Sequence, residues 1–588
     1  MRLGWTTGKY STTYRAVKTI RVDGKNKTLI VKSFGSDKFI RETYGVSDAK
    51  AWAAEQVRLM NEAEAEGSSI VTMELDPLKD LPLNVNSRFN AGYLFLQDVY
   101  YELGLHKICR AIAAKHSFQY DLNAVLSRLI YTRILFPSSK KSSFEDSFRF
   151  IEQPSFQLHD VYRALSVLAE ESDYIQNRLF KNSYDVSDRK TGVIYYDCTN
   201  FYFEIEQAED DKQYGKSKEN RPLPIIGMGL FMDTEGIPIA FSIFPGNTNE
   251  QTTMIPLEKK MIEQFDMSKF VVCTDSGLDG ANNRFFNDYN REDGMRCFIT
   301  TQPIKKLKGH LKGWALDTKG WMLPADSSAK VYDLTELDEN EDYDKVFYKS
   351  RWMYEESVVN YDGQERKTVI EQQLIVTYSI KYRNYLRKIR SGQIDRAIKR
   401  IQAGESAVSR KKTNDPMRFI QTQYTTPYGE VAEDRDSYLD TDRIEEEEQY
   451  DGFYAVCTNL EDDPVTIVKV NQRRWEIEEC FRIMKTDFEA RPVYVRNSDR
   501  ILAHFMTCFI ALIVYRYLEK KLDNRYTIDQ IVSTLQEMDV IKHEGKGYQP
   551  VYTRTEITDA LHEAFGFCTS KEVVSVKNMK KILAGTKK

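Results

Sequence analysis

The spacing of apolar and polar residues changes along the chain and divides it into regions. Residues 14–34 alternate with a period of two around the Asp23-Gly24 turn, which predicts a β-hairpin. Residues 47–66 are rich in Ala, Glu and Arg and predict a helix with Ser47 as its N-cap. We therefore treat residues 1–88 as an accessory region made of a hairpin and a helix.

Helical spacing dominates the next region. Apolar residues recur every three to four positions over 93–114, 121–135 and 158–179, and the Pro137-Ser138-Ser139 segment breaks the pattern. This predicts an N-terminal helical region over residues 89–190.

Short apolar strands begin after residue 190. The pattern predicts strands at 193–196, 225–232 and 237–244, then a helix at 251–265, a strand at 269–274, a helix at 280–289 and a strand at 296–300. Three successive strands followed by helix, strand, helix and strand is the order of an RNase H-like sheet, whose fourth strand pairs beside the first. We predict an α/β fold with an RNase H-like mixed sheet core, its first part over residues 191–300.

Residues 301–449 interrupt this order and predict an inserted, β-containing domain, with strands at 345–354 and 368–378. Residues 381–412 hold eleven Lys or Arg against two acids and predict a basic helix. A phosphate-binding stripe and an ordinary solvated helix face explain it equally well. Residues 430–448 hold ten acids against two Arg and predict a solvated loop.

The core then resumes over residues 450–522. The pattern predicts a strand at 452–457 and helices at 471–488 and 501–522. Residues 523–588 predict a C-terminal helical tail.

Composition narrows the cellular setting. The net charge is −5, and the eight cysteines show neither CxxC nor zinc-site spacing, which favours free thiols in a reducing compartment. The first residues lack the apolar core of a signal peptide, and the longest apolar stretch, near residues 505–515, is shorter than a bilayer requires. We expect a cytoplasmic, nucleoid-associated protein with no membrane partner.

Two aspartates follow apolar strand residues. Asp197 follows Val-Ile-Tyr-Tyr and Asp275 follows Val-Val-Cys-Thr. Either one alone is more simply explained as a turn or helix cap. A carboxylate buried in a sheet is costly unless a cation compensates it, so two such acids on neighbouring strands favour a shared divalent metal.

A third carboxylate is expected from the helix that contains Glu476, Glu478 and Glu479. At about 100° per residue, Glu478 lies about 40° from Arg474, and Lys485 lies about 20° from Glu478. Glu478 thus shares a stripe with two cations, as a metal ligand beside phosphate-binding groups would. An ordinary i,i+4 salt bridge explains the spacing equally well.

In these residues the chain resembles the DDE transposases of bacterial insertion sequences. The similar segments are YYDCTNFYFE, GKSKENRPLPIIGMGLFMDTEGIPIAFSIFPGNTNEQTT and VVCTDSGLDGANN. The branch in question has a Y-x2-R-x3-E-x6-K signature, which here matches Arg474, Glu478 and Lys485 but has Asn471 in place of Tyr. RPVYVR at 491–496 and His504 are also similar, and the resemblance covers roughly residues 90–520.

The resemblance implies an enzyme that cuts double-stranded DNA at the terminal inverted repeats of a transposon and joins the 3′-OH ends to target DNA. It implies Asp197, Asp275 and Glu478 as catalytic residues that hold two Mg²⁺ ions, for which Mn²⁺ can substitute. DNA contacts are expected from Arg474, Lys485, Asn471, Arg473 and Arg482. The helical region 89–190 is expected to recognise the DNA ends, and a homodimer is expected on DNA.

Three other functions fit the same residues. An RNase H-like nuclease would cut with these acids without joining ends. A catalytically inactive relative would bind DNA only. A structural or partner-binding protein would use the carboxylates as caps and would need no metal.

Overall fold

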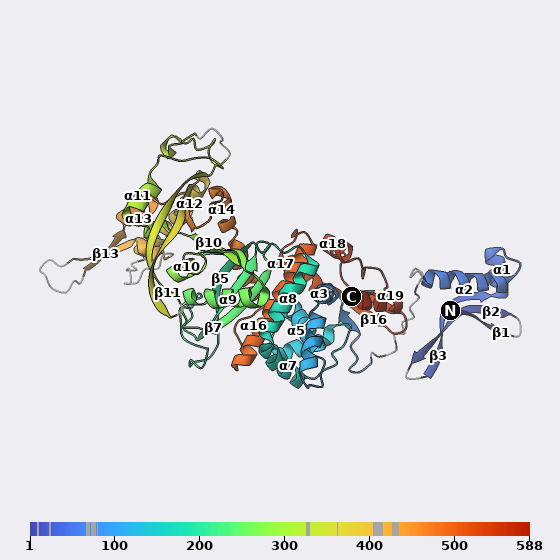
Figure 1. Ribbon diagram of the computed structural model, residues 1–588. Helices are drawn as coiled ribbons and strands as arrows, with labels where there is room; N and C mark the ends of the chain where they lie inside the picture. The colour runs from blue at the N-terminus through green and yellow to red at the C-terminus, as the bar shows by residue number, and fades with distance from the viewer. Residues whose placement is uncertain are drawn as a thin grey trace. The chain divides into compact units, whose positions relative to one another are not determined.

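The computed structural model spans residues 1–588 and describes all of them except 9–10, 23–24, 66–70, 72–77, 79, 81, 325–329, 362, 404–414 and 426–433. The chain forms two compact units, which are described separately below (Figure 1). The first consists of Met1–Asp188 and Arg482–Lys588, and the second of Arg189–Phe481.

A large mixed sheet forms the centre of the second unit. Its first five strands are β5 (Val193–Tyr202), β6 (Ile225–Asp233), β7 (Pro238–Pro245), β8 (Lys269–Thr274) and β10 (Gly294–Thr301). β5, β6 and β7 are antiparallel neighbours, whereas β8 runs parallel to both β5 and β10. The spatial order β7-β6-β5-β8-β10 confirms the predicted RNase H-like order. The connecting helices are α9 (Met254–Phe265) and α10 (Ala281–Phe286), and the short β9 (Tyr289–Arg291) pairs with β10.

The first strand is longer than predicted. The sequence predicts a strand that stops before Asp197, but β5 continues to Tyr202 and pairs with β6 through Tyr202↔Ile225. The polar residues after Asp197 obscured this extension, although they lie in a fully paired strand. On the other edge of β5, pairing with β8 stops at Tyr195↔Cys273, so Asp197 lies where the two parallel strands separate.

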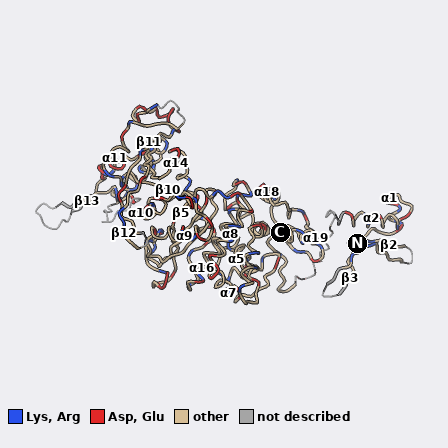
Figure 2. The backbone as a smooth tube through the Cα atoms, viewed as in Figure 1, with Lys and Arg blue, Asp and Glu red and all other residues tan. Residues whose placement is uncertain are grey.

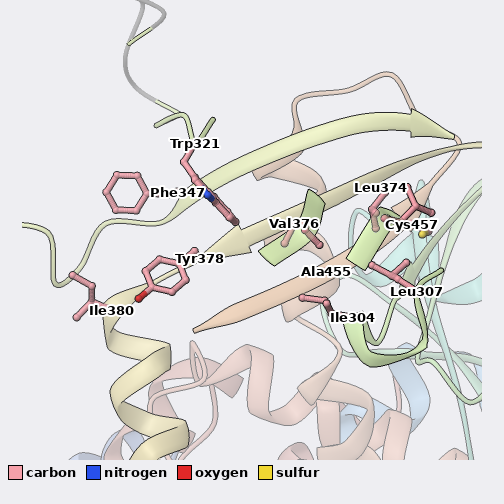
Figure 3. Packing of buried hydrophobic residues seen from close by; sticks show 12 residues of the cluster. Ile304, Leu307, Trp321, Phe347, Leu374, Val376, Tyr378, Ile380, Ala455 and Cys457 are labelled. Carbon is pink, nitrogen blue, oxygen red and sulfur yellow. The ribbon is translucent and has the colours of Figure 1, made fainter. Parts of the chain in front are cut away.

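The inserted segment extends the same sheet. β11 (Phe347–Tyr361) and β12 (Gln364–Tyr378) form a long hairpin, and β15 (Phe453–Thr458) lies antiparallel between β12 and β10. A buried apolar cluster unites the two parts (Figure 3); among its members are Ile304, Leu307, Trp321, Phe347, Leu374, Val376, Tyr378, Ile380, Ala455 and Cys457. Helix α11 (Gly309–Leu316) contributes Leu311 and Ala315 to it. The insert and the core sheet therefore share one hydrophobic core.

Both charged runs of the insert form regular structure, and acids from several parts of the chain pair with the basic run. The basic run forms α12 (Ile380–Gln402), and the acidic run is not the predicted loop, because it forms β14 (Asp434–Leu439), paired with β13 (Ile420–Thr425), and α13 (Thr441–Glu448). Residues 404–414 and 430–433 of these runs lie outside the described residues. Several cations of α12 face acids: Lys381 pairs with Asp344, Arg383 with Glu339, Arg387 and Arg390 with Asp451, and Arg400 with Asp415. These pairs reduce the positive charge that α12 offers to phosphate.

One predicted helix is divided into three pieces. Instead of a single helix over 471–488, the chain forms α14 (Pro464–Gln472), α15 (Trp475–Arg482) and a π-helical turn (Ile483–Asp487). A tertiary contact and a backbone turn account for the break. The Tyr195 hydroxyl donates to the Val470 carbonyl at 2.9 Å, and the Arg474 N–H donates to Asn471 instead of to Val470. The chain thus tightens into a turn at residues 473 and 474 before α15 begins.

The first unit is mainly helical. It contains α3 (Tyr93–Glu102), α4 (Leu105–Lys115), α5 (Leu122–Leu135), α6 (Lys140–Asp146), α7 (Leu158–Glu170), α8 (Ser172–Val186) and α16 (Ser498–Lys521). The predicted helix over 93–114 is interrupted at Gly104, whose φ of 68° ends α3 and begins α4. By length and composition α16 is able to cross a membrane, but 89% of its apolar window is buried, as in a core helix.

The C-terminal residues add three helices and part of a small sheet to this unit. The helices are α17 (Ile528–Glu537), α18 (Glu556–Phe565) and α19 (Val576–Gly585). Strand β16 (Asp539–His543) pairs with β17 (Gly547–Pro550) and with β4 (Arg88–Asn90). The sequence pattern did not indicate these strands.

All eight cysteines of the chain are free thiols, as the sequence analysis expected.

The N-terminal residues form a small sheet covered by two helices. β2 (Thr12–Val22) and β3 (Lys25–Ser36) confirm the predicted hairpin, whose Asp23-Gly24 turn lies outside the described residues, and β1 (Arg2–Thr7) adds a third strand. The helices are α1 (Asp37–Tyr44) and α2 (Ala49–Ala65). The predicted cap at Ser47 is wrong by one residue, because Asp48 accepts the first free N–H groups of α2, those of Lys50 and Ala51.

Candidate active site

Asp197 and Asp275 lie at the same level of the sheet. The pairing of β5 with β8 ends at Tyr195↔Cys273; two residues further along the chain, Asp197 lies within β5 and Asp275 directly follows β8. The Asp275 carboxylate accepts hydrogen bonds from the N–H groups of Gly277 and Leu278, at 2.8 and 3.1 Å. The Asp197 carboxylate accepts one from the N–H of Cys198 at 2.7 Å. Backbone donors thus orient both carboxylates on neighbouring strands.

The charge balance of this pair favours a cation. Burial first, and the Asp275 carboxylate second, raise the pKa of Asp197 to about 6 against the opposing effect of Lys218 and Arg474. Two carboxylates in a partly desolvated site repel each other, and a divalent cation with oxygen ligands removes that repulsion. The donor set is therefore the one that a hard cation such as Mg²⁺ prefers.

Glu478 is connected to the end of β10 through Arg474. Arg474 Nη1 donates to Thr301 Oγ1 at 3.2 Å, and Arg474 Nη2 lies 3.6 Å from Glu478 Oε1. Thr301 directly follows Thr300, which pairs with Thr274, so it lies beside Asp275 at the same sheet edge. The Glu478 side chain is 65% exposed, whereas that of Arg474 is 15% exposed. Arg474 is held in place by the sheet, and Glu478 extends into solvent.

The three acids do not form one cluster. Among the residues that the structure describes, no group of three His, Cys, Asp or Glu side chains is arranged to hold a metal ion. Asp197 and Asp275 are brought together, and Glu478 stays apart from them with Arg474 as its partner. Binding of a metal by all three acids would require the exposed Glu478 side chain to turn toward the pair.

Asn471 occupies a buried position instead of facing solvent. It is 1% exposed, accepts a hydrogen bond from the Cys273 thiol at 3.1 Å, and donates to the hydroxyls of Thr301 and Tyr454. With these partners its amide is occupied by the protein. The Tyr454 hydroxyl, from β15, thus contacts Asn471, the position at which the Y-x2-R-x3-E-x6-K signature has Tyr.

A cavity of about 350 Å³ opens next to this network. Residues of the insert line one part of this cavity, and residues at the end of α14 and the start of α15 line another. The lining includes Thr377, Tyr382, Tyr454, Arg474, Trp475 and Glu478. The Trp475 side chain is 61% exposed. Aromatic and charged side chains from the core and the insert thus line this cavity together with the expected third acid.

The remaining residues expected to contact DNA have different surroundings. Arg473 donates to Glu476 at 3.0 Å and is half exposed. Arg482 donates to Asp487 at 3.1 Å, and Lys485 is half-buried in the π-helical turn; both belong to the other unit. The helical stripe inferred for Lys485 depended on a continuous α-helix, which the π-turn interrupts.

Lys218 is a site residue that the sequence analysis did not identify. Its ammonium group donates to the Cys198 carbonyl, lies 3.6 Å from Glu250, and lowers the pKa of Asp197. A second cavity, of about 630 Å³, is lined by Lys216, Lys218, Asn249, Glu250 and Gly277, among other residues. The only sequence signal was the pair of lysines in the GKSK segment between β5 and β6.

Comparisons with known proteins give a family for this chain. The sequence model of the family described as "Transposase DDE domain" matches residues 189–514, which is more than half of the chain. No curated protein matches the chain. Among solved structures, a piggyBac transposase synaptic complex with hairpin DNA is 8% identical over 84% of each chain, with a TM-score of 0.35. A Mos1 transposase paired-end complex is 12% identical over 42% of this chain and 66% of that chain, with a TM-score of 0.12.

Proposed function

Because the chain belongs to the transposase DDE domain family, we propose that it cuts DNA at transposon ends and joins the resulting 3′-OH ends to target DNA. Members of this family use divalent metal ions. The finer assignment, to bacterial insertion-sequence transposases with a Tyr-Arg-Glu-Lys signature, rests on Arg474, Glu478 and Lys485.

The observation that carries this proposal is the pairing of Asp197 with Asp275. Two carboxylates meet where parallel strands separate, and the pKa of one is raised by burial and by the other. Such an arrangement costs free energy in a protein without a cation. Turn-capping alone explains Asp275, which binds two N–H groups, but it does not explain why Asp197 lies beside it.

The chain's own residues have distinct roles in this mechanism. Bound Mg²⁺ or Mn²⁺ would activate the attacking hydroxyl and stabilise the leaving oxygen of the scissile phosphate. Asp197 and Asp275 would hold the cations, oriented by the N–H groups of Cys198, Gly277 and Leu278. Glu478 would complete the ligand set when its exposed side chain turns inward.

Two cations border the carboxylates and suit phosphate binding. Arg474 uses one Nη atom on Thr301 and has a planar guanidinium that can also bind a phosphate oxygen. Lys218 adds a point charge on the side of Asp197. We propose that Tyr454 takes the place of the family tyrosine, because Asn471 is buried and bonded within the protein.

A cleavage and joining assay tests this function. Purified protein is incubated with Mg²⁺, a DNA duplex carrying the ends of the element that encodes it, and a supercoiled target plasmid. Cleavage at the end junction together with end–target joint products supports a transposase. Cleavage without joint products indicates an RNase H-like nuclease. Specific binding without cleavage indicates a catalytically inactive relative.

A further inference from the structure

A cavity of about 450 Å³ lies at the β11 edge of the large sheet. Residues 351–355 of β11 line one side, and residues between β10 and the first turn of α11 line the other, among them Lys306, Leu307, Lys308 and Leu311. Leu307 and Leu311 also belong to the buried cluster that unites the insert with the core (Figure 3). The hydrophobic core therefore fixes this wall of the cavity.

The cavity carries positive charge that acids of the protein do not balance. Lys306, Lys308 and Arg351 line it with exposed side chains. Among the residues that the structure describes, these three form no salt bridge. Residues 303–312 hold four lysines and no acid; Figure 2 colours these lysines blue. A surface whose charge is left unbalanced attracts an anion.

The acid in the lining, Glu355, is neutralised within the protein. Arg284 Nη1 donates to the Glu355 carboxylate at 3.0 Å, and the Gln372 amide donates to the same oxygen at 2.7 Å. The Arg284 side chain is only 8% exposed, so it meets Glu355 from the interior. Lys306, Lys308 and Arg351 therefore set the net charge of the cavity.

Two aromatic rings lie beside these cations. Trp352 is 38% exposed, Tyr354 is 68% exposed, and both line the cavity. A hydrogen bond to Glu371, which lies opposite on β12, raises the pKa of the Tyr354 hydroxyl and fixes that end of the ring. Exposed rings beside cations are the composition of single-strand sites, where bases stack on the rings and cations bind the phosphates. The bases of an intact duplex are already stacked and paired.

The cavity is connected to the candidate active site through Asp279. Burial raises the pKa of Asp279, Arg284 and Lys306 lower it, and Asp275 raises it. Arg284, which binds Glu355, also binds the Asp279 carboxylate at 3.0 Å. Lys306 and Asp275 thus lie within electrostatic range of the same carboxylate, which places the cavity near Asp275.

We propose that this cavity binds a single strand of DNA, with phosphates on Lys306 and Lys308 and a base against Trp352. Its volume lies in the range of about 300–1,000 Å³ that is usual for small-ligand sites, which admits a nucleotide but not a duplex. The inference rests on the proposed function only for the choice of DNA as the nucleic acid. The strand would be one that cleavage beside Asp275 sets free.

Two matched double variants of the full chain test the phosphate contacts. K306A/K308A removes two exposed lysines from the cavity, and K259A/K269A removes two exposed lysines from α9 and the start of β8 in the same unit. Both change the net charge equally. Binding of a fluorescent oligothymidylate of about 12 nucleotides, a length within the usual site size, is measured by anisotropy at several salt concentrations. EDTA is present so that no metal-dependent cleavage occurs.

We expect K306A/K308A to bind the oligonucleotide about tenfold more weakly and to lose about 1.4 units of slope in log K against log salt, about 0.7 for each phosphate contact. K259A/K269A should bind like the wild type. Trp352→Ala should weaken binding about tenfold, whereas Trp352→Phe keeps a ring for stacking and should bind nearly like the wild type. Binding of a duplex should be unchanged in Trp352→Ala.

Several results would overturn the proposal. These are no binding of the oligonucleotide by the wild type, no loss in K306A/K308A or in Trp352→Ala, and an equal loss in K259A/K269A. A loss of duplex binding as large as that of single-strand binding, or tighter binding of an oligouridylate RNA, would also do so. Circular dichroism confirms the folding of each variant. Because cleavage is not measured, failure of this site is distinct from failure of the proposed catalytic activity.

Discussion

The guanidinium of Arg474 lies 3.6 Å from the carboxylate of Glu478, while its other Nη atom donates to Thr301 at the end of β10. One arginine therefore connects the expected third acid to the sheet edge that holds Asp275. Arg474 is mostly buried and Glu478 is mostly exposed, so the acid has the freedom to move and the arginine does not.

Replacement of Arg474 by Lys should strongly reduce DNA cleavage. A lysine has no planar fork with which to bind Thr301 and a phosphate together. We expect cleavage rates to fall about 10²–10³-fold, the usual effect of removing one positioned charge-stabilising donor. Arg443→Lys is the control, because Arg443 is half exposed and pairs with Glu446. Similar rates for Arg474→Lys and the control would contradict this role.

Replacement of Asn471 by Leu should destabilise the protein. The change leaves the Cys273 thiol and the hydroxyls of Thr301 and Tyr454 without their shared partner in a buried site. We expect a loss of about 2–4 kcal/mol in the free energy of unfolding, measured by thermal or denaturant melting. Tyr454→Phe removes only one hydroxyl and should cost about 1 kcal/mol. A neutral Asn471→Leu variant would show that this network does not hold α14 to the sheet.

Replacement of Asp197 by Asn should stabilise the metal-free protein. The amide keeps an oxygen for the Cys198 N–H but removes a negative charge that burial and Asp275 both disfavour. We expect a gain of about 2 kcal/mol in unfolding free energy near pH 7 when EDTA is present. Added Mn²⁺ should raise the melting temperature of the wild type and leave that of the variant unchanged. An equal Mn²⁺ shift in both proteins would place the cation elsewhere.

The buried carboxyl group of Glu258 should make the stability of the folded protein depend on pH. It is fully buried in α9, accepts a hydrogen bond from Asn287 at 3.0 Å, and its pKa is raised to about 8 by burial. A raised carboxyl pKa means that the folded state binds the proton more tightly than the unfolded state. Stability is therefore lost as pH rises from the unfolded pKa, near 4.5, to about 8.

Glu258→Gln should remove this loss because the amide stays neutral. At pH 8.5 the variant should be more stable than the wild type by roughly 4–5 kcal/mol in unfolding free energy, and the difference should shrink toward pH 5. Thermal melts at both pH values make the comparison. A difference that stays constant with pH would mean that Glu258 does not titrate in this range.

The sequence predicted the order of the core strands because each is short, apolar and separated by clear turns. It also identified Asp197 and Asp275 by their places after buried strands. It missed the second half of β5, since Cys198, Thr199 and Asn200 lack the alternation of a strand although they pair fully with β6. The alternation of apolar and polar residues cannot indicate a strand whose residues face protein on both sides.

The prediction of one continuous helix around Glu478 was wrong because it took no account of tertiary contacts. A helical wheel assumed one continuous helix, but the hydroxyl of Tyr195, distant in sequence, binds the Val470 carbonyl and helps divide it. The same limit applies to the acidic run near residue 447. Its composition is that of a loop, yet it forms a strand and a helix, and Glu447 and Glu448 of the helix pair with Arg418 and Arg390.

The most direct test of the central claim compares Asp275→Asn with Asp266→Asn in a cleavage assay on DNA carrying the transposon ends, with Mg²⁺ or with EDTA. Asp266 is an exposed residue in a left-handed position after α9, where Asn is well tolerated. The account predicts Mg²⁺-dependent cleavage by the wild type and by Asp266→Asn, and none by Asp275→Asn, although that variant still binds the DNA. Cleavage by Asp275→Asn at the wild-type rate, or cleavage by the wild type in EDTA, would contradict the metal–carboxylate mechanism.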